Sequence, residues 1–372
     1  MPDALRVLSI FGTRPEAIKM APVLKRLSAT PSVESIVCIT AQHREMLDQV
    51  LELFDIRPDY DLDLMKPDQP LGELTANVFE GLGPVIKSVV PDWVLVQGDT
   101  TTVMSAALLA YYHRVKVGHV EAGLRTGDKY QPFPEEINRR VLGAVADLHF
   151  APTEWAQNNL LKESVSPEKI IVTGNTVIDA LNLVIQRPVE LFVGPLADLS
   201  DGRIILVTVH RRENFGEPME RIFEALREIA RHYEGRAHLV YPVHLNPRVQ
   251  EPAKRMLSGV PNIHLIEPLA YLPMVHLIKR AHIILTDSGG IQEEAPGLGT
   301  PVLVLRERTE RPEALEAGSA LLVGTDKDRI VSETRRLMDD PKAHAAMATA
   351  VNPFGDGQAA ERVVEALLAA QE

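Results

Sequence analysis

Short apolar runs alternate with longer amphipathic patterns along almost the whole chain of 372 residues. The runs in the first half are "RVLSIF", "SIVCIT", "WVLVQ", "KVGHV", "LHFA" and "KIIVTG", and those in the second half are "IILVTV", "AHLVYPV", "NIHLIE", "HIILTD" and "PVLVL". Helical patterns follow most of them, for example at 15–27, where proline opens the first turn, and at 101–112. Strands that alternate with helices are typical of βαβ units, so we expect an α/β protein with parallel sheets.

The length of the chain favours two domains over one hydrophobic core. The alternation breaks at "QRPVELFVGPLADLSDGR", which is rich in prolines, glycines and acids. We therefore expect a first Rossmann-like domain at 1–185, a linker at 186–203 and a second Rossmann-like domain at 204–355. The remaining 356–372 predicts an amphipathic helix, for which packing back on the first domain is one option. Two doubly wound domains with an interdomain cleft would bring the strand carboxyl ends face to face.

Composition excludes several classes of protein. The formal charge of -12 disfavours a broad nucleic-acid-binding surface but leaves room for a small anionic ligand. Cys38 is the only cysteine, so a disulfide within the chain is impossible and a thiolate metal site is disfavoured. No apolar run has the length of a membrane span or of a signal peptide. We expect a soluble cytoplasmic protein with no metal and no membrane partner.

Polar residues gather where the predicted strands end, in "FGTRPEAIK", "QGDTTT", "HVEAGLRTGD", "TVHRREN", "PVHLNP" and "TDSGGIQEE". Paired glycines after a strand let backbone N–H groups approach a phosphate closely. We expect Glu293 and Glu294 in the first turn of the helix that follows, where acids can simply offset the helix dipole.

Together these motifs, from "FGTRPEAIKMAP" to "NPFGDGQA", closely resemble those of the bacterial non-hydrolysing UDP-N-acetylglucosamine 2-epimerases. The resemblance implies two Rossmann-like domains of the glycosyltransferase-B type. It also implies reversible conversion of UDP-N-acetylglucosamine to UDP-N-acetylmannosamine without a cofactor, by elimination of UDP to a glycal and its re-addition. A homodimer and a role in cell-envelope or capsule precursor synthesis are implied likewise.

The resemblance assigns roles to residues that have ordinary alternatives. Ser288, Gly289 and Gly290 would meet the phosphates, Glu294 the ribose and Arg311 the nucleotide. Arg14 and Lys19 would contact the substrate, although a solvated basic pair would look the same in sequence. His210 would stabilise departing UDP, whereas a lone histidine is more often structural. Met274 occupies a position near the uracil pocket where the family often has an aromatic side chain.

The family places carboxylates around the sugar at Asp99, Glu121 and Glu135, with Arg139 beside the last. Asp99 could equally cap the helix that begins near Thr101, and Glu135 could favour a helix start. Which carboxylate removes the C2 proton and which returns it stays open. The bacterial branch also suggests a second, activating UDP-N-acetylglucosamine, whose matching residues are Gln42, His43, Gln69, Glu136, Arg211 and His244.

Three other functions share parts of this pattern. A UDP-sugar-dependent glycosyltransferase would use the same fold and nucleotide half, a hydrolysing epimerase would release free N-acetylmannosamine, and a silent sensor would not need the acidic group. The joint presence of the three carboxylates favours the epimerase. The alternating acids Asp59, Asp61 and Asp63 predict a solvated edge or loop, since isolated carboxylates rarely form a metal site without further ligands.

Overall fold

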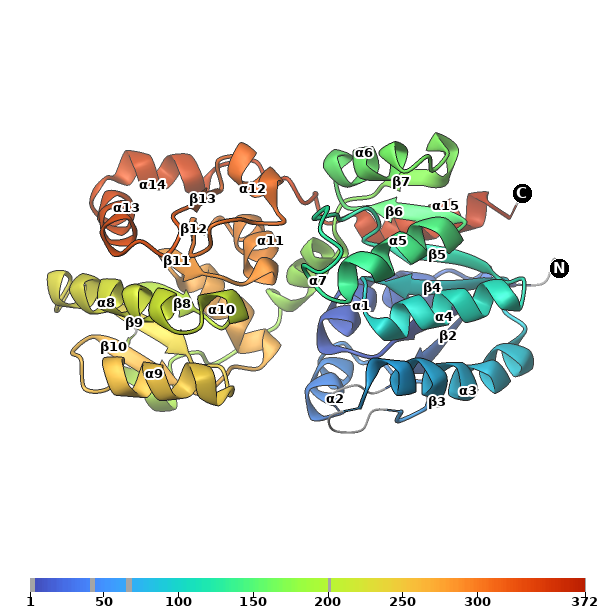
Figure 1. Cartoon of the computed structure of the whole chain (residues 1–372), viewed down its shortest axis with the longest axis horizontal. Helices are drawn as coiled ribbons and strands as arrows, with labels where there is room; N and C mark the ends of the chain where they lie inside the picture. Colours follow the sequence, from blue (N-terminus) through green and yellow to red (C-terminus); the bar gives the residue numbers. More distant parts are fainter. Residues whose placement is uncertain (1–3, 41–43, 65–68, 200–201, 372) are drawn as a thin grey trace. The chain divides into compact units, whose positions relative to one another are not determined.

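Two compact units make up the protein, and each contains a parallel sheet covered by helices (Figure 1). The computed structural model describes residues 4–40, 44–64, 69–199 and 202–371. The first unit comprises Met1–Leu183 and Phe354–Glu372, and the second comprises Val184–Pro353. The expected α/β class with two Rossmann-like, doubly wound domains is confirmed.

The first unit has a seven-stranded sheet in the order β3-β2-β1-β4-β5-β6-β7, with every neighbouring pair parallel. Its strands are β1 (Leu5–Phe11), β2 (Val33–Ile39), β3 (Tyr60–Asp61), β4 (Trp93–Gln97), β5 (Lys116–Val120), β6 (Leu148–Ala151) and β7 (Ile170–Val172). Its helices are α1 (Arg14–Ser28), α2 (Arg44–Leu53), α3 (Leu71–Val89), α4 (Thr101–Tyr112), α5 (Glu135–Val145), α6 (Glu154–Lys162), α7 (Thr176–Val184) and α15 (Ala359–Ala369).

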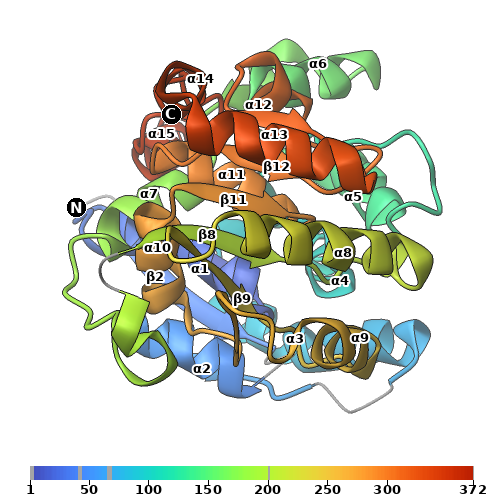
Figure 2. The ribbon, with the colours of Figure 1, turned by 90° about the vertical axis from the view of Figure 1, so that its left-hand side faces the viewer.

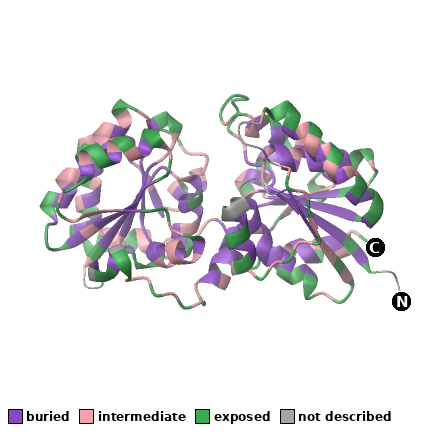
Figure 3. Cartoon of the chain, turned by 90° about the horizontal axis from the view of Figure 1, so that it is seen from below, coloured by how far each residue is buried: buried purple, intermediate pink, exposed green. Residues whose placement is uncertain are grey.

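The first sheet forms because its central strands are apolar on both faces. Every residue of β4 is buried, and the strands of the sheets are largely coloured as buried in Figure 3. Helices α3, α4 and α5 contribute side chains to one continuous apolar cluster with these strands. Threonine N-caps mark the starts of α1, α4 and α6. The side chains of Thr13, Thr100 and Thr153 each accept a hydrogen bond from a backbone N–H of the first turn. The two-residue β3 was not predicted as a strand, and it lies at the edge of the sheet.

The second unit has a six-stranded parallel sheet in the order β10-β9-β8-β11-β12-β13. Its strands are β8 (Arg203–Thr208), β9 (Ala237–Pro242), β10 (Ile263–Ile266), β11 (Ile283–Thr286), β12 (Val302–Val304) and β13 (Ala320–Leu322). Its α-helices are α8 (Glu217–His232), α9 (Pro247–Leu257), α10 (Tyr271–Arg280), α11 (Gly289–Gly297), α12 (Pro312–Glu316), α13 (Lys327–Asp339) and α14 (Pro341–Ala348). Helices α13, α8 and α9 lie side by side over the same apolar core (Figure 2).

The last helix belongs to the first unit even though the second unit precedes it in the chain. Helix α15 packs on α1, and the buried carboxylate of Asp179 accepts the N–H groups of Ala359 at 3.3 Å and Ala360 at 2.9 Å. Asp179 therefore caps α15, because the side chain of its own N-cap, Gln358, makes no such bond. The segment 186–203, expected as a linker, lies in the second unit and contains a short 3₁₀ helix at Gly194–Leu199.

Strand order reverses once in each sheet. In the first unit the reversal falls between β1 and β4, and in the second unit between β8 and β11. The connections from these neighbouring strands leave in opposite directions, which opens a crevice at the strand carboxyl ends where ligands of α/β proteins bind. The motifs "FGTRPE" and "QGDTT" follow β1 and β4, and "HRREN" and "DSGG" follow β8 and β11. Each unit thus carries its unusual residues at its own switch point.

Candidate active site

Glu16 joins the two loops at the switch point of the first unit. Its carboxylate accepts the N–H groups of Gly12 at 2.7 Å and Thr13 at 2.9 Å, and its other oxygen accepts the hydroxyl of Thr100 at 2.7 Å. Burial raises the pKa of Glu16, while these hydrogen bonds oppose the rise. Glu16 was not predicted as a site residue, although "TRPE" has the spacing of a capping box. Arg14, the first residue of α1, is half-buried.

Glu121 is the centre of a second group in the same unit. Its side chain is 8% exposed, it forms an ion pair with Lys19, and it accepts hydrogen bonds from Gln97 and, at 3.4 Å, from Asn175. These partners come from α1, the end of β4 and the loop before α7. Glu121 itself has φ 66°, a left-handed conformation that is uncommon for a side chain of this size. The structure therefore brings Lys19 and Glu121 together, in an arrangement held by several elements.

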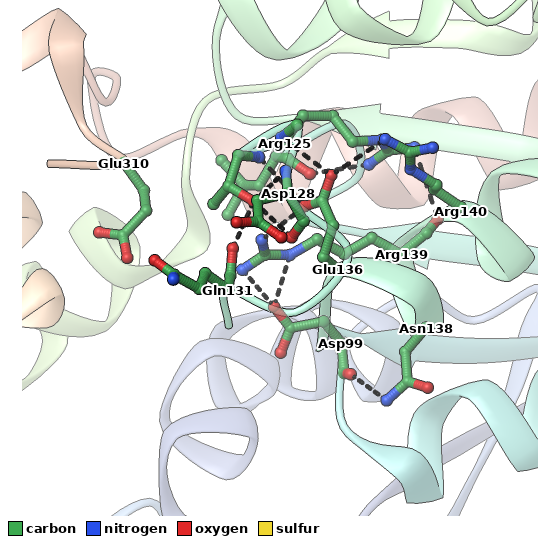
Figure 4. A network of polar contacts seen from close by, with 12 residues as sticks. Asp99, Arg125, Asp128, Gln131, Glu136, Asn138, Arg139, Arg140 and Glu310 are labelled. Atoms are coloured by element: carbon green, nitrogen blue, oxygen red, sulfur yellow. Dashed lines mark hydrogen bonds and ion pairs between the residues drawn. The ribbon is translucent and has the colours of Figure 1, made fainter. Parts of the chain in front are cut away.

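Asp99 and Arg139 form the third group (Figure 4). The guanidinium of Arg139 contacts Oδ2 of Asp99 twice, through Nε at 2.8 Å and through Nη2 at 2.7 Å. Asn138 also donates to the backbone carbonyl of Asp99 at 2.8 Å. The alternative that Asp99 caps α4 is wrong, because the N-cap is Thr100, whose hydroxyl accepts from the N–H of Val103. The Asp99 carboxylate is thus directed to a cation of α5 and not to the start of α4.

Glu135 and Glu136 are neighbours at the start of α5 with different surroundings. Oε2 of Glu135 is buried and has no hydrogen-bond partner among the residues that the structure describes. Glu136 is fully buried and accepts the N–H groups of Thr126 at 3.0 Å and Gly127 at 3.1 Å, and it also pairs with Arg139 at 3.3 Å (Figure 4). Glu136 therefore fixes the loop before α5, whereas Glu135 retains an acceptor for another group.

Asp287 organises the switch point of the second unit. Its buried carboxylate accepts the N–H of His210 at 2.9 Å, the N–H of Arg211 at 2.8 Å and the amide of Asn214 at 3.0 Å. The imidazole Nδ1 of His210 lies 3.6 Å from Oδ1 of Asp287, and its ring stacks on that of His244 at 5.4 Å. Burial lowers the pKa of His210, and the charge of Asp287 opposes this effect. Asp287 was also missed, although it directly follows a buried strand.

Two guanidinium groups converge on the start of α11. A Cβ placed on Gly289 would lie 3.3 Å from Nη2 of Arg211 and 3.9 Å from Nη2 of Arg311. Arg311 is oriented by Glu293, whose Oε1 accepts from its Nε at 2.5 Å. Nε of Arg211 is buried and has no hydrogen-bond partner in the described part of the chain. The free N–H groups of a helix N-terminus and two cations together form a site for an anion.

The expected position of the two acids in α11 is wrong by about one turn. Helix α11 begins at Gly289 and has no acid in its first turn, so Glu293 and Glu294 lie further along. The alternative that these acids only offset the helix dipole therefore no longer applies, because the interaction of a charge with the dipole falls off within the first turn. Glu293 instead pairs with Arg311, and Glu294 is half-buried.

The remaining predicted residues are more scattered. Met274 is half-buried on α10, His244 is exposed, and Gln69 is half-buried before α3, whereas Gln42 and His43 lie outside the described residues. Within the described ranges, no group of three or more His, Cys, Asp or Glu side chains is arranged to hold a metal ion. No helix in those ranges is long and apolar enough to cross a membrane.

Comparisons with known proteins agree on one family. A family model described as UDP-N-acetylglucosamine 2-epimerase matches residues 25–368. A UDP-N-acetylglucosamine 2-epimerase of Yersinia pestis is 56% identical over 370 residues, and one of Escherichia coli strain K12 is 55% identical over 371 residues; each alignment covers 98% of both chains. A crystal structure of the Neisseria meningitidis UDP-GlcNAc 2-epimerase bound to UDP-GlcNAc matches with a TM-score of 0.90 and 50% identity, covering 98% of this chain and all of that one.

Proposed function

The chain belongs to the UDP-N-acetylglucosamine 2-epimerase family, and on that premise we propose how its two groups of residues act on the nucleotide sugar. It is a UDP-N-acetylglucosamine 2-epimerase, an isomerase. The proposal is that it inverts C2 reversibly, giving UDP-N-acetylmannosamine, by eliminating UDP to a glycal and adding it back.

The convergence of Arg211 and Arg311 on Gly289 carries the nucleotide part of the proposal. Two cations and a helix N-terminus without acids in its first turn suit a diphosphate, whose charge increases as UDP departs. Glu294 is assigned to the ribose hydroxyls. His210 is assigned to the leaving phosphate, where its backbone is held by Asp287. Arg14 and Lys19 are assigned to the substrate from the first unit.

The three carboxylates of the first unit are assigned to the sugar. Asp99 is paired with Arg139 and Glu121 with Lys19, which leaves both in defined orientations. Oε2 of Glu135 has no partner among the described residues, and this supports Glu135 as the group that takes or returns the C2 proton.

Elimination must activate C2, because that carbon has no neighbouring carbonyl and its hydrogen is not acidic. The C1–O bond breaks with its electron pair going to UDP, and a carboxylate takes the C2 proton as the C1–C2 double bond forms. Protonation of C2 from the opposite face and re-addition of UDP at C1 give the epimer. No atom is gained or lost over the cycle. The chain has no GxGxxG sequence at the strand-to-helix turn that an alternative oxidation at C3 by a nicotinamide would use.

The test is to incubate the protein with UDP-N-acetylglucosamine alone in deuterium oxide and identify the products. We expect UDP-N-acetylmannosamine with deuterium at C2, and exchange of the anomeric oxygen that links C1 to UDP. Free N-acetylmannosamine would indicate a hydrolysing epimerase, transfer of the sugar a glycosyltransferase, and no turnover a sensor. Epimer with hydrogen fully retained at C2 would rule out the elimination mechanism.

We also propose that a second UDP-N-acetylglucosamine activates the enzyme through residues that include Arg211 and His244. The stacking of His244 on His210 supports this, because it connects a predicted activator contact with the proposed leaving-group histidine. Turnover of UDP-N-acetylmannosamine alone should then be slow until a trace of the other epimer is added. Hyperbolic kinetics from both sides would contradict it. A cytoplasmic homodimer that supplies cell-envelope precursors is proposed on the family likeness, and sedimentation would check the dimer.

A further inference from the structure

Arg306 lies shortly after β12 and is 6% exposed, and it forms ion pairs with carboxylates of two different loops. Its Nε and Nη2 contact Glu213 at 2.5 and 3.3 Å, and its Nη1 and Nη2 contact Glu310 at 2.6 and 3.3 Å. Both contacts are therefore bidentate. A buried ion pair is weak evidence for stability, because desolvation of the charges can offset their attraction. The role of Arg306 is therefore sought in which segments its two ion pairs hold together.

The two loops joined by Arg306 carry the two cations at the start of α11. Glu213 is two residues after Arg211, and Glu310 directly precedes Arg311. The second loop is also tied to α11 through the hydroxyl of Thr309, which donates to Gln292 at 2.6 Å. Arg306 thus connects the loop of one guanidinium with the loop of the other.

Glu310 is a carboxylate close to the arginine proposed to hold the phosphates. Nη1 of Arg311 already donates to the backbone carbonyl of Glu310 at 3.4 Å. Although burial opposes it, the hydrogen bonds and charge of Arg306, together with the charge of Arg311, lower the pKa of Glu310 to about 2. Glu310 is therefore ionised at neutral pH and within electrostatic reach of Arg311.

We propose that Arg306 is a positioning residue for the diphosphate site: it occupies the Glu310 carboxylate, so that Arg311 remains directed at the start of α11. The inference rests on the proposed function, since it concerns the same nucleotide site. Without Arg306, the charge of Arg311 still acts on the Glu310 carboxylate, and an internal carboxylate then competes with the phosphates for that guanidinium. The effect on binding comes from this competition and not from a general loss of folding.

Binding of UDP to the full chain, measured by calorimetry, tests the proposal without turnover. Arg306→Met should weaken UDP binding about tenfold or more, since the charge-assisted contact between Arg311 and the diphosphate is lost. Adding Glu310→Gln to Arg306→Met should restore most of the affinity, because the competing charge is gone. Adding Glu213→Gln to Arg306→Met should not restore the affinity for UDP. Arg335→Met is the control, since it removes an arginine of α13 that pairs with Glu228 of α8, and it should bind UDP like the wild type.

The single variant Glu310→Gln separates the proposal from a merely structural crosslink and stays informative if Arg306→Met does not fold. The proposal expects it to bind UDP as well as the wild type, whereas a structural crosslink would be broken and binding would weaken. Loss of affinity in Glu310→Gln, or no recovery in Arg306→Met/Glu310→Gln, overturns the inference alone. A wild type that binds no UDP would overturn the proposed function together with it.

Discussion

Replacing Asp287 by asparagine keeps the shape of the side chain and removes its charge. In the structure Oδ2 accepts from three donors, the N–H groups of His210 and Arg211 and the amide of Asn214, and Oδ1 lies 3.0 Å from the N–H of His210. If the asparagine oxygen takes the place of Oδ2, its NH₂ group faces the N–H of His210, so two donors meet. The opposite orientation brings three donors against the NH₂ group and is worse.

The cost follows from the better orientation. Three hydrogen bonds lose their charge, at about 0.5–1 kcal/mol each, and one buried donor contact adds about 1–2 kcal/mol. We therefore expect Asp287→Asn to destabilise the second unit by about 3 kcal/mol, or to lower its Tm by roughly 6–12 °C. UDP binding should weaken as well, because the backbone of Arg211 loses its anchor.

Hydrogen exchange of peptides from 203–216 measures the local cost. Fluorescence of Trp93 and Trp155, the only two tryptophans, follows the first unit and should not change. Asp340→Asn is the matched control, since Asp340 accepts two N–H groups at an exposed helix start where asparagine is an equally good cap. If Asp287→Asn costs no more than this control, the carboxylate does not hold the "HRREN" loop and the reasoning fails.

Three further predictions concern the first unit. Gly123→Ala places a Cβ 2.2 Å from the carbonyl oxygen of Ala156 at a positive φ and should cost more than about 3 kcal/mol, whereas Gly127→Ala, with an open site, should cost about 1 kcal/mol in urea unfolding. Asp179→Ala should cost about 1–2 kcal/mol and speed hydrogen exchange in 359–369; unchanged exchange there would mean that α15 needs no cap. Burial lowers the pKa of His119 to about 3, so the stability from its neutral form is complete above about pH 6.5 and is lost as the pH falls towards 3, by up to about 1.4 kcal/mol per pH unit. Tryptophan-monitored unfolding should show a smaller acid slope for His119→Gln, and equal slopes would contradict this.

The sequence predicted the parts of the fold that depend on local pattern. The eleven apolar runs that were expected as strands all occur as strands, because each is rich in apolar and β-branched residues and is followed by a helix or turn signal. The short strands β3 and β13 were not predicted: β3 has only two residues and lies in the acidic stretch "DYDLDL", and β13 has only three residues. Helix α11 begins directly at Gly289, and this places Glu293 and Glu294 beyond its first turn.

The candidate site also divides into features that depend on local sequence and features that depend on long-range contacts. Strand-end motifs supplied the candidate residues, because placement at the end of a strand is a local feature of the sequence. Their partners depend on strand order: Thr100 is 84 positions from Glu16, and Asn214 is 73 from Asp287. Sequence spacing does not reveal such long-range pairs, so the contacts of Glu16 with Thr100 and of Asp287 with Asn214 were not predicted, although the capping-box spacing of Glu16 was visible in the sequence. The assigned roles of Asp99, Glu121, Glu135 and the nucleotide residues stay predictions until they are tested.

The cap that Asp179 supplies to α15 also bears on the order of synthesis. Segment 354–372 leaves the ribosome after every residue of the second unit, yet it covers the first. The second unit is continuous in sequence and can fold as soon as it is made, while the first must wait with the face for α15 uncovered. A nascent chain stalled before residue 359 would therefore present the Asp179 carboxylate without its two N–H partners and leave α1 partly bare. The first unit is therefore synthesised first but completed last, and it is the unit that would present incompletely covered surface to a chaperone.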